Sequence, residues 1–413
     1  MSKIKVLTIF GTRPEAVKLA PVIKELSKRE NTISRVCVTG QHRQMLEQML
    51  KNFEIEPDYD LDIMKSRQSL TDILTNSMLA LEPIMKEFQP DVVLCQGDTS
   101  STFAASLSAF YHKAKVGHIE AGLRTGEKYS PFPEEMNRVL TSRLADFSFA
   151  PTELNRNNLL KEGIPEESIF ITGNTVIDAL DLTVRDNYKY ESKELKDIDL
   201  DKKTVLITAH RRENLGQPLR NICNAIKHLA EDYPEYNFIY PIHMNPAVRE
   251  VADRILTSQP NVYLIEPLDV FDMHNLMANS HLILSDSGGI QEEAPSFDVP
   301  VIVLRTSTER PEALETGATI LAGVEEENIY NIAKELLTDS NKYAEMAKAK
   351  NPYGDGTASR QIVDVLEQYG ATETEPLSSF ENKQDSEKVE EYVMPLRGKS
   401  SPSNDNVRKT NNT

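Results

Sequence analysis

A cationic side chain stands where the first apolar run of the sequence ends. Residues 5–10 predict a buried strand, and Gly11-Thr12-Arg13-Pro14 leads from it into a helical pattern. Ligands of open α/β sheets bind beyond the carboxyl ends of the strands, where a helix N-terminus attracts anions. We therefore expect Arg13 to contact an anionic ligand; a capping or surface role is the alternative.

Three carboxylates stand at comparable places in the first half of the chain. Asp98 follows a predicted strand at 91–95 and is either a reactive group at the strand tip or the cap of the next helix. Glu120 ends the next strand, and since burying a carboxylate without a partner is costly, we expect Arg124 or a ligand hydroxyl to pair with it. Glu134, with Glu135 beside it, opens a helical pattern, where the helix dipole alone explains the pair. Gathered in one cleft, the three form an acid/base set.

The second half of the chain contains a phosphate-binding pattern. A predicted strand at 282–285 leads to Ser287, Gly288 and Gly289, which begin a helix. Glycines allow close approach to the backbone, whose free N–H groups bind a diphosphate; an ordinary glycine-rich turn is the alternative. One helical turn later, the Glu293 carboxylate is placed to accept hydrogen bonds from a ribose diol.

Two more side chains of this half are candidates for the same site. His210 follows a predicted strand at 204–208 and precedes two arginines, so it is either an acid or hydrogen-bond donor near neutral pH or a structural residue. Arg310 lies in a segment that resembles the one around Arg13, with an arginine before a proline. It is a second candidate for a cation that binds an anionic ligand. No other histidine stands at metal-ligand spacing, which argues against a zinc site.

The elements that must position these residues alternate regularly. Short apolar strands and longer amphipathic helices predict parallel sheets covered on both faces, and the pattern restarts after a polar stretch at 184–203 that resembles a linker or a surface-exposed connection. We expect an α/β fold with two doubly wound, Rossmann-like domains across a cleft. The domains span residues 1–175 and 176–355, and a disordered tail follows at 371–413.

The composition narrows the class of protein. A formal net charge of −18 over 413 residues disfavours nucleic acid and anionic membranes as partners. The three cysteines are far apart, as in a cytoplasmic protein, and neither a signal peptide nor a membrane span is indicated. The single G-x-G, at 354–356, follows no strand, so a nicotinamide cofactor is not expected.

Ten motifs occur together and in order over about residues 3–369: GTRPEA, QHR, GDT, HIEAGLR, PFPEEMNR, GNTVIDAL, TAHRRENLG, SDSGGIQEEAP, TERPEA and NPYGDG. With them the chain resembles the non-hydrolysing UDP-N-acetylglucosamine 2-epimerases of bacteria. The resemblance implies a GT-B architecture, in which a last helix at about 356–370 crosses back to the first domain. It also implies a homodimer, no cofactor or metal, and interconversion of UDP-N-acetylglucosamine (UDP-GlcNAc) and UDP-N-acetylmannosamine (UDP-ManNAc). The expected route is anti-elimination of UDP to 2-acetamidoglucal and re-addition, for cell-envelope polysaccharide synthesis.

The resemblance also assigns residues. The family's catalytic positions match Asp98, Glu120, Glu134 and His210, and its UDP-binding positions match Arg13, Lys18, Ser287, Gly288, Gly289, Glu293 and Arg310. Positions linked to binding of a second UDP-GlcNAc as activator match Gln41, Gln44, Arg67, Arg211 and His243, with Glu134 shared. The chain departs from the family pattern at Gln96, Ser100, Ser101, Met273 and Thr306.

Three other functions share parts of this pattern. A hydrolysing UDP-GlcNAc 2-epimerase would release free N-acetylmannosamine, and a GT-B glycosyltransferase would share the fold and the diphosphate site. The three carboxylates favour the epimerase over the transferase. A catalytically silent nucleotide-sugar sensor is disfavoured because the four catalytic positions are intact.

Overall fold

Two parallel sheets form the framework of the molecule in a computed structural model that describes residues 3–40, 43–63 and 68–372. Sheet A has the order β3-β2-β1-β4-β5-β6-β7. Its strands are β1 (Ile4–Phe10), β2 (Thr32–Val38), β3 (Tyr59–Asp60), β4 (Val92–Gln96), β5 (Lys115–Ile119), β6 (Phe147–Ala150) and β7 (Ile169–Ile171). The predicted tail lies outside the described residues from position 373 onward.

Helices cover both faces of sheet A, because each joins two parallel strands. They are α1 (Arg13–Lys28), α2 (Arg43–Asn52), α3 (Leu70–Phe88), α4 (Ser100–Tyr111), α5 (Glu134–Leu144) and α6 (Glu153–Lys161). One core contains Val6 and Phe10 with Leu19 of α1, and the core on the other face contains Leu7, Ile9 and Cys95. Strands buried on both faces account for the nearly continuous apolar runs in the sequence.

A buried carboxylate joins the N-termini of α1 and α4. Glu15 Oε2 accepts the backbone N–H groups of Gly11 (3.0 Å) and Thr12 (2.7 Å), while Oε1 accepts the hydroxyls of Thr99 (2.8 Å) and Thr102 (2.9 Å). Burial raises the pKa of Glu15 above its ordinary value, although the hydrogen bonds lower it. This carboxylate fixes the ends of β1 and β4 relative to each other, at the edge where ligands of such sheets bind.

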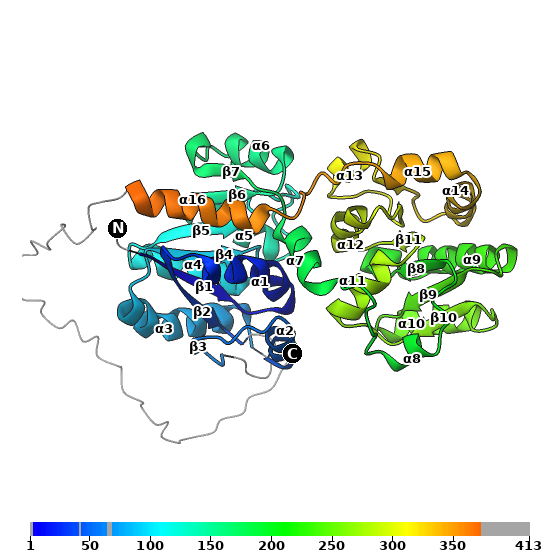
Figure 1. Cartoon of the computed structure of the whole chain (residues 1–413), viewed down its shortest axis with the longest axis horizontal. Coiled ribbons are helices and arrows are strands. Elements are labelled where there is room, and N and C mark those ends of the chain that lie inside the picture. Colours follow the sequence, from blue (N-terminus) through cyan, green and yellow to red (C-terminus); the bar gives the residue numbers. More distant parts are fainter. Residues whose placement is uncertain (1–2, 41–42, 64–67, 373–413) are drawn as a thin grey trace, which may run out of the picture. The chain divides into compact units, whose positions relative to one another are not determined.

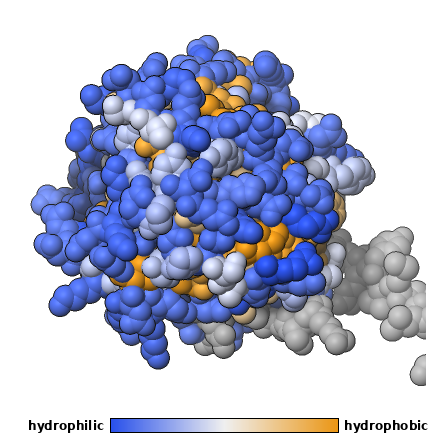
Figure 2. Space-filling model, turned by 90° about the vertical axis from the view of Figure 1, so that its right-hand side faces the viewer, coloured by the Kyte–Doolittle hydropathy of each residue, from blue (hydrophilic) through white to orange (hydrophobic). Residues whose placement is uncertain are grey.

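Sheet B repeats the design with the order β10-β9-β8-β11-β12-β13. Its strands are β8 (Thr204–Thr208), β9 (Asn237–Pro241), β10 (Val262–Ile265), β11 (Leu282–Ser285), β12 (Val301–Val303) and β13 (Thr319–Leu321). Its helices are α9 (Gln217–Asp232), α10 (Pro246–Leu256), α11 (Val270–Ala278), α12 (Gly288–Glu293), α13 (Pro311–Glu315), α14 (Glu326–Thr338) and α15 (Ser340–Ala347). On the face shown in Figure 2, hydrophilic side chains cover most of the surface and hydrophobic ones show between them in small groups. The expected α/β fold with two doubly wound parallel sheets is confirmed.

Two helices connect the halves. α7 (Thr175–Thr183) packs against α1 and α16 and also against α11 and α12. α16 (Ala358–Thr372) follows sheet B in sequence but lies against α1 and β1, where Ile362 and Leu366 join the sheet A core (Figure 1). Asp178 of α7 accepts the N–H groups of Ala358 (3.2 Å) and Ser359 (2.7 Å), which fixes the start of α16.

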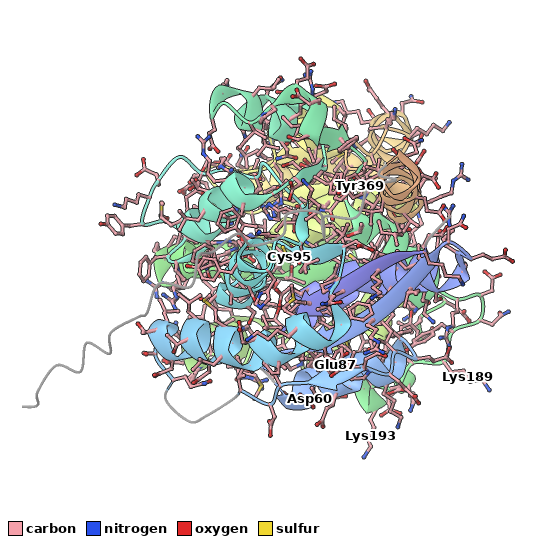
Figure 3. All side chains as sticks on the ribbon, turned by 90° about the vertical axis from the view of Figure 1, so that its left-hand side faces the viewer. Asp60, Glu87, Cys95, Lys189, Lys193 and Tyr369 are labelled. Atoms are coloured by element: carbon pink, nitrogen blue, oxygen red, sulfur yellow. The ribbon has the colours of Figure 1, made fainter. Side chains whose placement is uncertain are left out.

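The stretch at 184–203, predicted as a linker or a surface-exposed connection, is largely exposed but is also anchored to the sheet B half. It contains the short helix α8 (Lys193–Lys196), and Leu195 and Ile198 are buried in the core beside sheet B. The Asp272 carboxylate also accepts two of its backbone N–H groups, at 2.9 and 2.7 Å. Most other side chains of the stretch are exposed, and Lys189 and Lys193 project outward (Figure 3), so a few buried groups anchor a polar segment. Among the described residues no helix is long and apolar enough to span a membrane.

Candidate active site

Glu120 occupies a strained position directly after β5. Its φ of +65° lies in the left-handed region, which non-glycine residues avoid and which is found disproportionately at functional sites. Lys18 of α1 donates to both carboxylate oxygens, at 2.6 and 2.7 Å, and the Gln96 amide donates to Oε2. Burial raises the pKa of Glu120, but the Lys18 ammonium together with Arg310 and Arg138 outweighs it, so the net pKa is below the ordinary value. Glu120 is therefore an anion near neutral pH.

Glu120 pairs with Lys18 and not with Arg124, the protein partner expected from the sequence. Arg124 instead forms a bidentate ion pair with Glu162, with Nε to Oε1 at 2.7 Å and Nη2 to Oε2 at 2.9 Å. The four-residue spacing suggested a local pair, but the turn after β5 carries Arg124 away toward α6. The long-range contact with Lys18 replaces it, and the positive charge on Lys18 is stabilised in turn, since Glu120 and Glu292 offset the burial that lowers its pKa.

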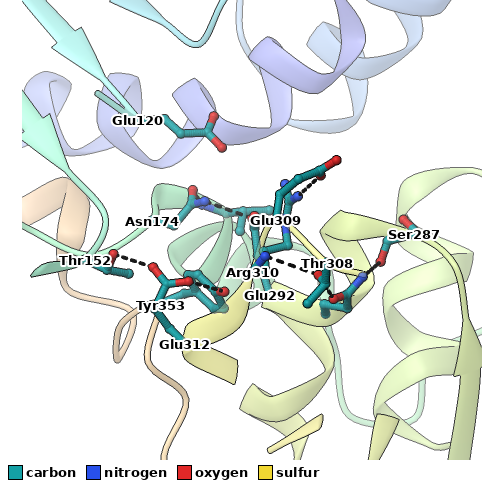
Figure 4. Close-up of polar contacts among 12 residues, drawn as sticks. Glu120, Thr152, Asn174, Ser287, Glu292, Thr308, Glu309, Arg310, Glu312 and Tyr353 are labelled. Carbon is teal, nitrogen blue, oxygen red and sulfur yellow. Dashed lines mark hydrogen bonds and ion pairs between the residues drawn. The ribbon is translucent and has the colours of Figure 1, made fainter. Parts of the chain in front are cut away.

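A cavity brings Glu120 together with Arg310 from the other half of the chain. Figure 4 shows Glu120 above the group formed by Arg310, Glu292 and Glu309. Arg310 Nε donates to Glu292 Oε1 at 2.7 Å, and Nη1 donates to Glu309 Oε2 at 2.9 Å. Burial lowers the pKa of Arg310, but these carboxylates raise it by more, so the guanidinium stays charged.

Further polar contacts tie the rim of this cavity together. Asn174 donates to Glu292 Oε2 at 3.0 Å, and Thr152 donates to Glu312 Oε1 at 2.7 Å (Figure 4). The Tyr353 hydroxyl donates to the other oxygen of Glu312 at 3.3 Å. Burial raises the pKa of Glu292 despite the nearby Arg310 and Lys18. Within one cavity, Glu120 and Glu292 thus have pKa values shifted in opposite directions.

The glycine pattern after β11 meets Arg310 directly. A Cβ at Gly288 would lie 2.6 Å from Arg310 Cζ, so only glycine lets the guanidinium lie there. Ser287 caps the six-residue helix α12, and its N–H donates to Ser285 Oγ at 2.9 Å. The Glu293 carboxylate lies 3.3 Å from His274 Nε2, and a Cβ at Gly289 would meet Glu293 at 3.1 Å. Ser287, both glycines, Glu293 and Arg310 therefore form one cluster.

Asp98 belongs to a neighbouring cluster in the sheet A half. Its carboxylate forms an ion pair with Arg138, whose other Nη donates to Glu135 at 3.0 Å. Glu135 also accepts the N–H groups of Thr125 and Gly126, so it has a structural role in holding the loop before α5. The charge of Arg138 also helps to lower the pKa of Glu120, which connects this cluster to the cavity.

Glu134 lies beside Glu135 but makes different contacts. Its Oε2 is buried and has no hydrogen-bond partner among the described residues. A buried carboxylate oxygen without a partner is costly, since it has lost its water and gained no donor. Of the three predicted carboxylates, Glu134 is the one with an unpaired buried oxygen.

His210 forms a third group, at the carboxyl ends of β8 and β9. Its ring stacks on that of His243, with centroids 5.0 Å apart and planes at 4°. The Asp286 carboxylate lies behind it, with Oδ1 3.6 Å from His210 Nδ1. The positive charge of Arg211, which follows His210 in the sequence, helps to lower the pKa of Glu309. Because Glu309 pairs with Arg310, the histidine pair adjoins the Arg310 cluster.

The remaining predicted residues are placed as follows. Arg13 is exposed at the first position of α1 and has no hydrogen-bond or ion-pair partner within the described residues. Gln41 and Arg67 lie outside the described residues, as does the side chain of Gln44. Of the departures from the family pattern, Gln96 contacts Glu120, Met273 packs against the core beside sheet B, and Thr306 is exposed.

Several residues of these clusters were not singled out from the sequence. They are Glu292, Glu309, Glu312, Tyr353, Asp286 and Arg138. Glu292 and Asp286 lie on either side of the predicted phosphate-binding pattern. A carboxylate near glycines at the end of a strand was therefore the sequence signal that could have identified them. Taken together, the groups provide buried carboxylates, largely buried cations and a titratable histidine, which suits chemistry on an anionic substrate with proton transfer.

Comparison with known proteins points to one family. A family model described as UDP-N-acetylglucosamine 2-epimerase matches residues 24–367. A Bacillus subtilis protein of that name is 54% identical over 384 residues, covering 93% of this chain and 100% of its own. The Neisseria meningitidis UDP-GlcNAc 2-epimerase, solved bound to UDP-GlcNAc, has 52% identity and a TM-score of 0.78, covering 88% of this chain and 100% of its own. A structure from S. aureus in complex with UDP has 49% identity and a TM-score of 0.80, covering 90% and 98%.

Proposed function

The chain belongs to the UDP-N-acetylglucosamine 2-epimerase family, and from this premise we propose that it interconverts UDP-GlcNAc and UDP-ManNAc without releasing the free sugar. The observation that carries the proposal is the cavity that Glu120 and Arg310 share. It combines a carboxylate kept ionised by Lys18 with a charged guanidinium beside two glycines. The relatives solved with UDP-GlcNAc and with UDP support a nucleotide sugar as the ligand.

The chemistry follows from the substrate. The hydrogen on C2 is not acidic, because no carbonyl is attached to that carbon. Cleavage of the C1–O bond gives C1 positive character and acidifies C2, and the bonding electrons leave with UDP. Removal of the C2 proton then yields 2-acetamidoglucal. Re-addition of UDP to C1, with a proton delivered to the opposite face of C2, gives the epimer and restores all atoms.

Each cluster has a part in this scheme. The cationic groups Arg13, Lys18 and Arg310, with the N–H groups at 287–289, bind the diphosphate and stabilise the charge that develops on it. Asp98, Glu120 and Glu134 supply the acid and base on the two faces of the sugar. The charge of Glu120 suits a base, and the unpaired oxygen of Glu134 suits a group that exchanges a proton.

The wider context of the reaction follows from the resemblance. We expect the active form to be a homodimer in the cytoplasm and the product to enter cell-envelope polysaccharides. Light scattering on the purified protein measures the oligomeric state, and a monomeric mass would refute that expectation.

One experiment separates the candidate functions. The protein is incubated with UDP-GlcNAc in D2O, and proton and phosphorus NMR follow C2 and the diphosphate. Deuterium at C2 in both UDP-linked epimers is the expected result. Free N-acetylmannosamine with UDP would identify a hydrolysing enzyme, and an unchanged substrate would identify a transferase or a sensor.

A further inference from the structure

A fully buried carboxylate lies behind His210. Asp286 follows β11 and is 0% exposed. Its Oδ2 accepts the backbone N–H groups of His210 (2.7 Å) and Arg211 (2.8 Å) and the side-chain amide of Asn214 (3.0 Å). Its Oδ1 has no hydrogen-bond partner among the described residues and lies 3.6 Å from His210 Nδ1. Three donors hold one oxygen, and the other is left for the imidazole.

We propose that Asp286 is the positioning residue for His210: its Oδ1 accepts Nδ1–H, which fixes the imidazole tautomer and stabilises the imidazolium. The inference rests on the proposed function, to which it adds that His210, a match to one of the family's catalytic positions, contacts the diphosphate. Asp286 acts only through His210, because it has no exposed surface for a ligand to touch. The His210 side chain is 40% exposed, so the ring is the part of this pair that a ligand reaches.

The orientation of the carboxylate is fixed by its surroundings. Because Oδ2 accepts three N–H groups from two segments of chain, the group cannot rotate without breaking them. The gap of 3.6 Å exceeds a hydrogen bond, and a small ring rotation closes it, as catalytic hydrogen bonds often tighten only in the substrate complex. With Nδ1–H held there, Nε2 is free for the ligand.

The net pKa of His210 lies below its ordinary value, and Asp286 offsets part of the lowering. Burial lowers the pKa of His210, and so do His243, stacked on it from the segment after β9, and Arg211 on its own segment. Asp286 acts in the opposite direction and favours the imidazolium. Two stacked imidazoles do not both carry a charge readily, and the carboxylate behind His210 selects that ring.

The contribution to the reaction is electrostatic. When the C1–O bond breaks, the bonding electrons move onto the diphosphate oxygen, and the His210 imidazolium donates a hydrogen bond to it. Asp286 keeps its charge and takes no proton. Re-addition reverses the same changes, so no net proton transfer passes through this pair.

The test is Asp286→Asn, observed first by 15N NMR of the histidine side chains in the free protein. The three N–H donors fix the amide oxygen on their side, which turns the amide NH2 toward Nδ1 and reverses the tautomer. Neutral His210 should be the Nδ1–H form in the wild type and the Nε2–H form in the variant, with a lower pKa. The spectrum of His210→Gln assigns the signal. We expect kcat to fall about 100-fold with little change in KM.

Asp178→Asn is the matched control. Asp178 is also buried and accepts two backbone N–H groups, 3.2 and 2.7 Å away, but at the start of α16. This variant should lower Tm without changing the tautomer of His210 or the pH profile of kcat. A loss of kcat in Asp286→Asn with an unchanged tautomer and pKa would reduce Asp286 to a structural role.

The wild-type spectrum alone also decides the question if Asp286→Asn does not fold. A neutral His210 in the Nε2–H form would overturn the proposal. The NMR measurement needs no substrate turnover, so its result is independent of whether the protein proves to be an epimerase.

Discussion

Replacing Lys18 by methionine should destabilise the protein strongly, and the structure indicates by how much. Lys18 Nζ lies 2.6 and 2.7 Å from the two oxygens of Glu120, and only 18% and 8% of the two side chains are exposed. Methionine fills a similar volume but leaves the buried carboxylate without its ammonium partner, so that the Gln96 amide is its remaining hydrogen-bond donor among the described residues. Loss of one partner from a buried pair costs about 3–5 kcal/mol of unfolding free energy.

The cost should depend on pH in a defined direction. In the wild type the pKa of Glu120 is lowered, so its contribution to stability is present above the unfolded pKa and disappears as the pH falls through the folded one. Without Lys18, only the charges of Arg310 and Arg138 oppose burial, so the folded pKa of Glu120 should rise. The stability deficit of Lys18→Met should therefore be small in acid and grow as the pH rises toward neutrality.

Urea unfolding across this pH range measures the effect, with two further variants. Lys28→Met removes a lysine from the same helix whose side chain is 70% exposed, and it should change stability by less than about 1 kcal/mol. Adding Glu120→Gln to Lys18→Met removes the unpaired charge and should restore part of the loss. A deficit in Lys18→Met that equals that of Lys28→Met, or that shrinks as the pH rises, would refute the buried pair.

Three further variants test other parts of the site. Asp98→Asn and Glu134→Gln should each lower kcat by about 10²–10⁴-fold with an unchanged circular dichroism spectrum, and near-normal rates would rule out acid/base roles. Gly288→Ala should weaken UDP binding about tenfold in calorimetry, because the new Cβ would lie 2.6 Å from Arg310 Cζ; unchanged affinity would mean that this guanidinium does not bind the diphosphate. Arg124→Met should lower Tm yet leave kcat close to that of the wild type, since Arg124 pairs with Glu162; a lost kcat with an unchanged Tm would contradict this structural role.

Most of the fold follows from local patterns in the sequence. Buried parallel strands such as β8 and β11 are nearly continuous apolar runs, and their boundaries were predicted to the residue. The edge strands β3 and β13 were not predicted, because strands of two or three residues have too few positions to show a period. Leu195 and Ile198 were assigned to a polar linker since their burial depends on packing against distant strands.

The site was predictable only where a reactive side chain stands at the end of a strand or in a segment that resembles one. Glu120 directly follows a strand, and Arg310 lies in a segment that resembles the strand exit at Arg13. The structure places both at one cavity. The partner of Glu120 was not predictable from spacing, because Lys18 lies a hundred residues away and meets it only through the sheet order. Glu292 lies inside a helix, where a carboxylate usually faces solvent, and only the tertiary structure turns it toward Arg310.

The most direct test of the proposed function is whether the C1–O bond breaks during epimerisation. UDP-GlcNAc is prepared with 18O in the bridge between C1 and the β-phosphorus, and phosphorus NMR follows the position of the label. Because cleaved UDP can rotate its terminal phosphate before re-addition, we expect 18O to move into the non-bridging positions as UDP-ManNAc accumulates. Formation of UDP-ManNAc with all of the label still in the bridge would contradict elimination and re-addition.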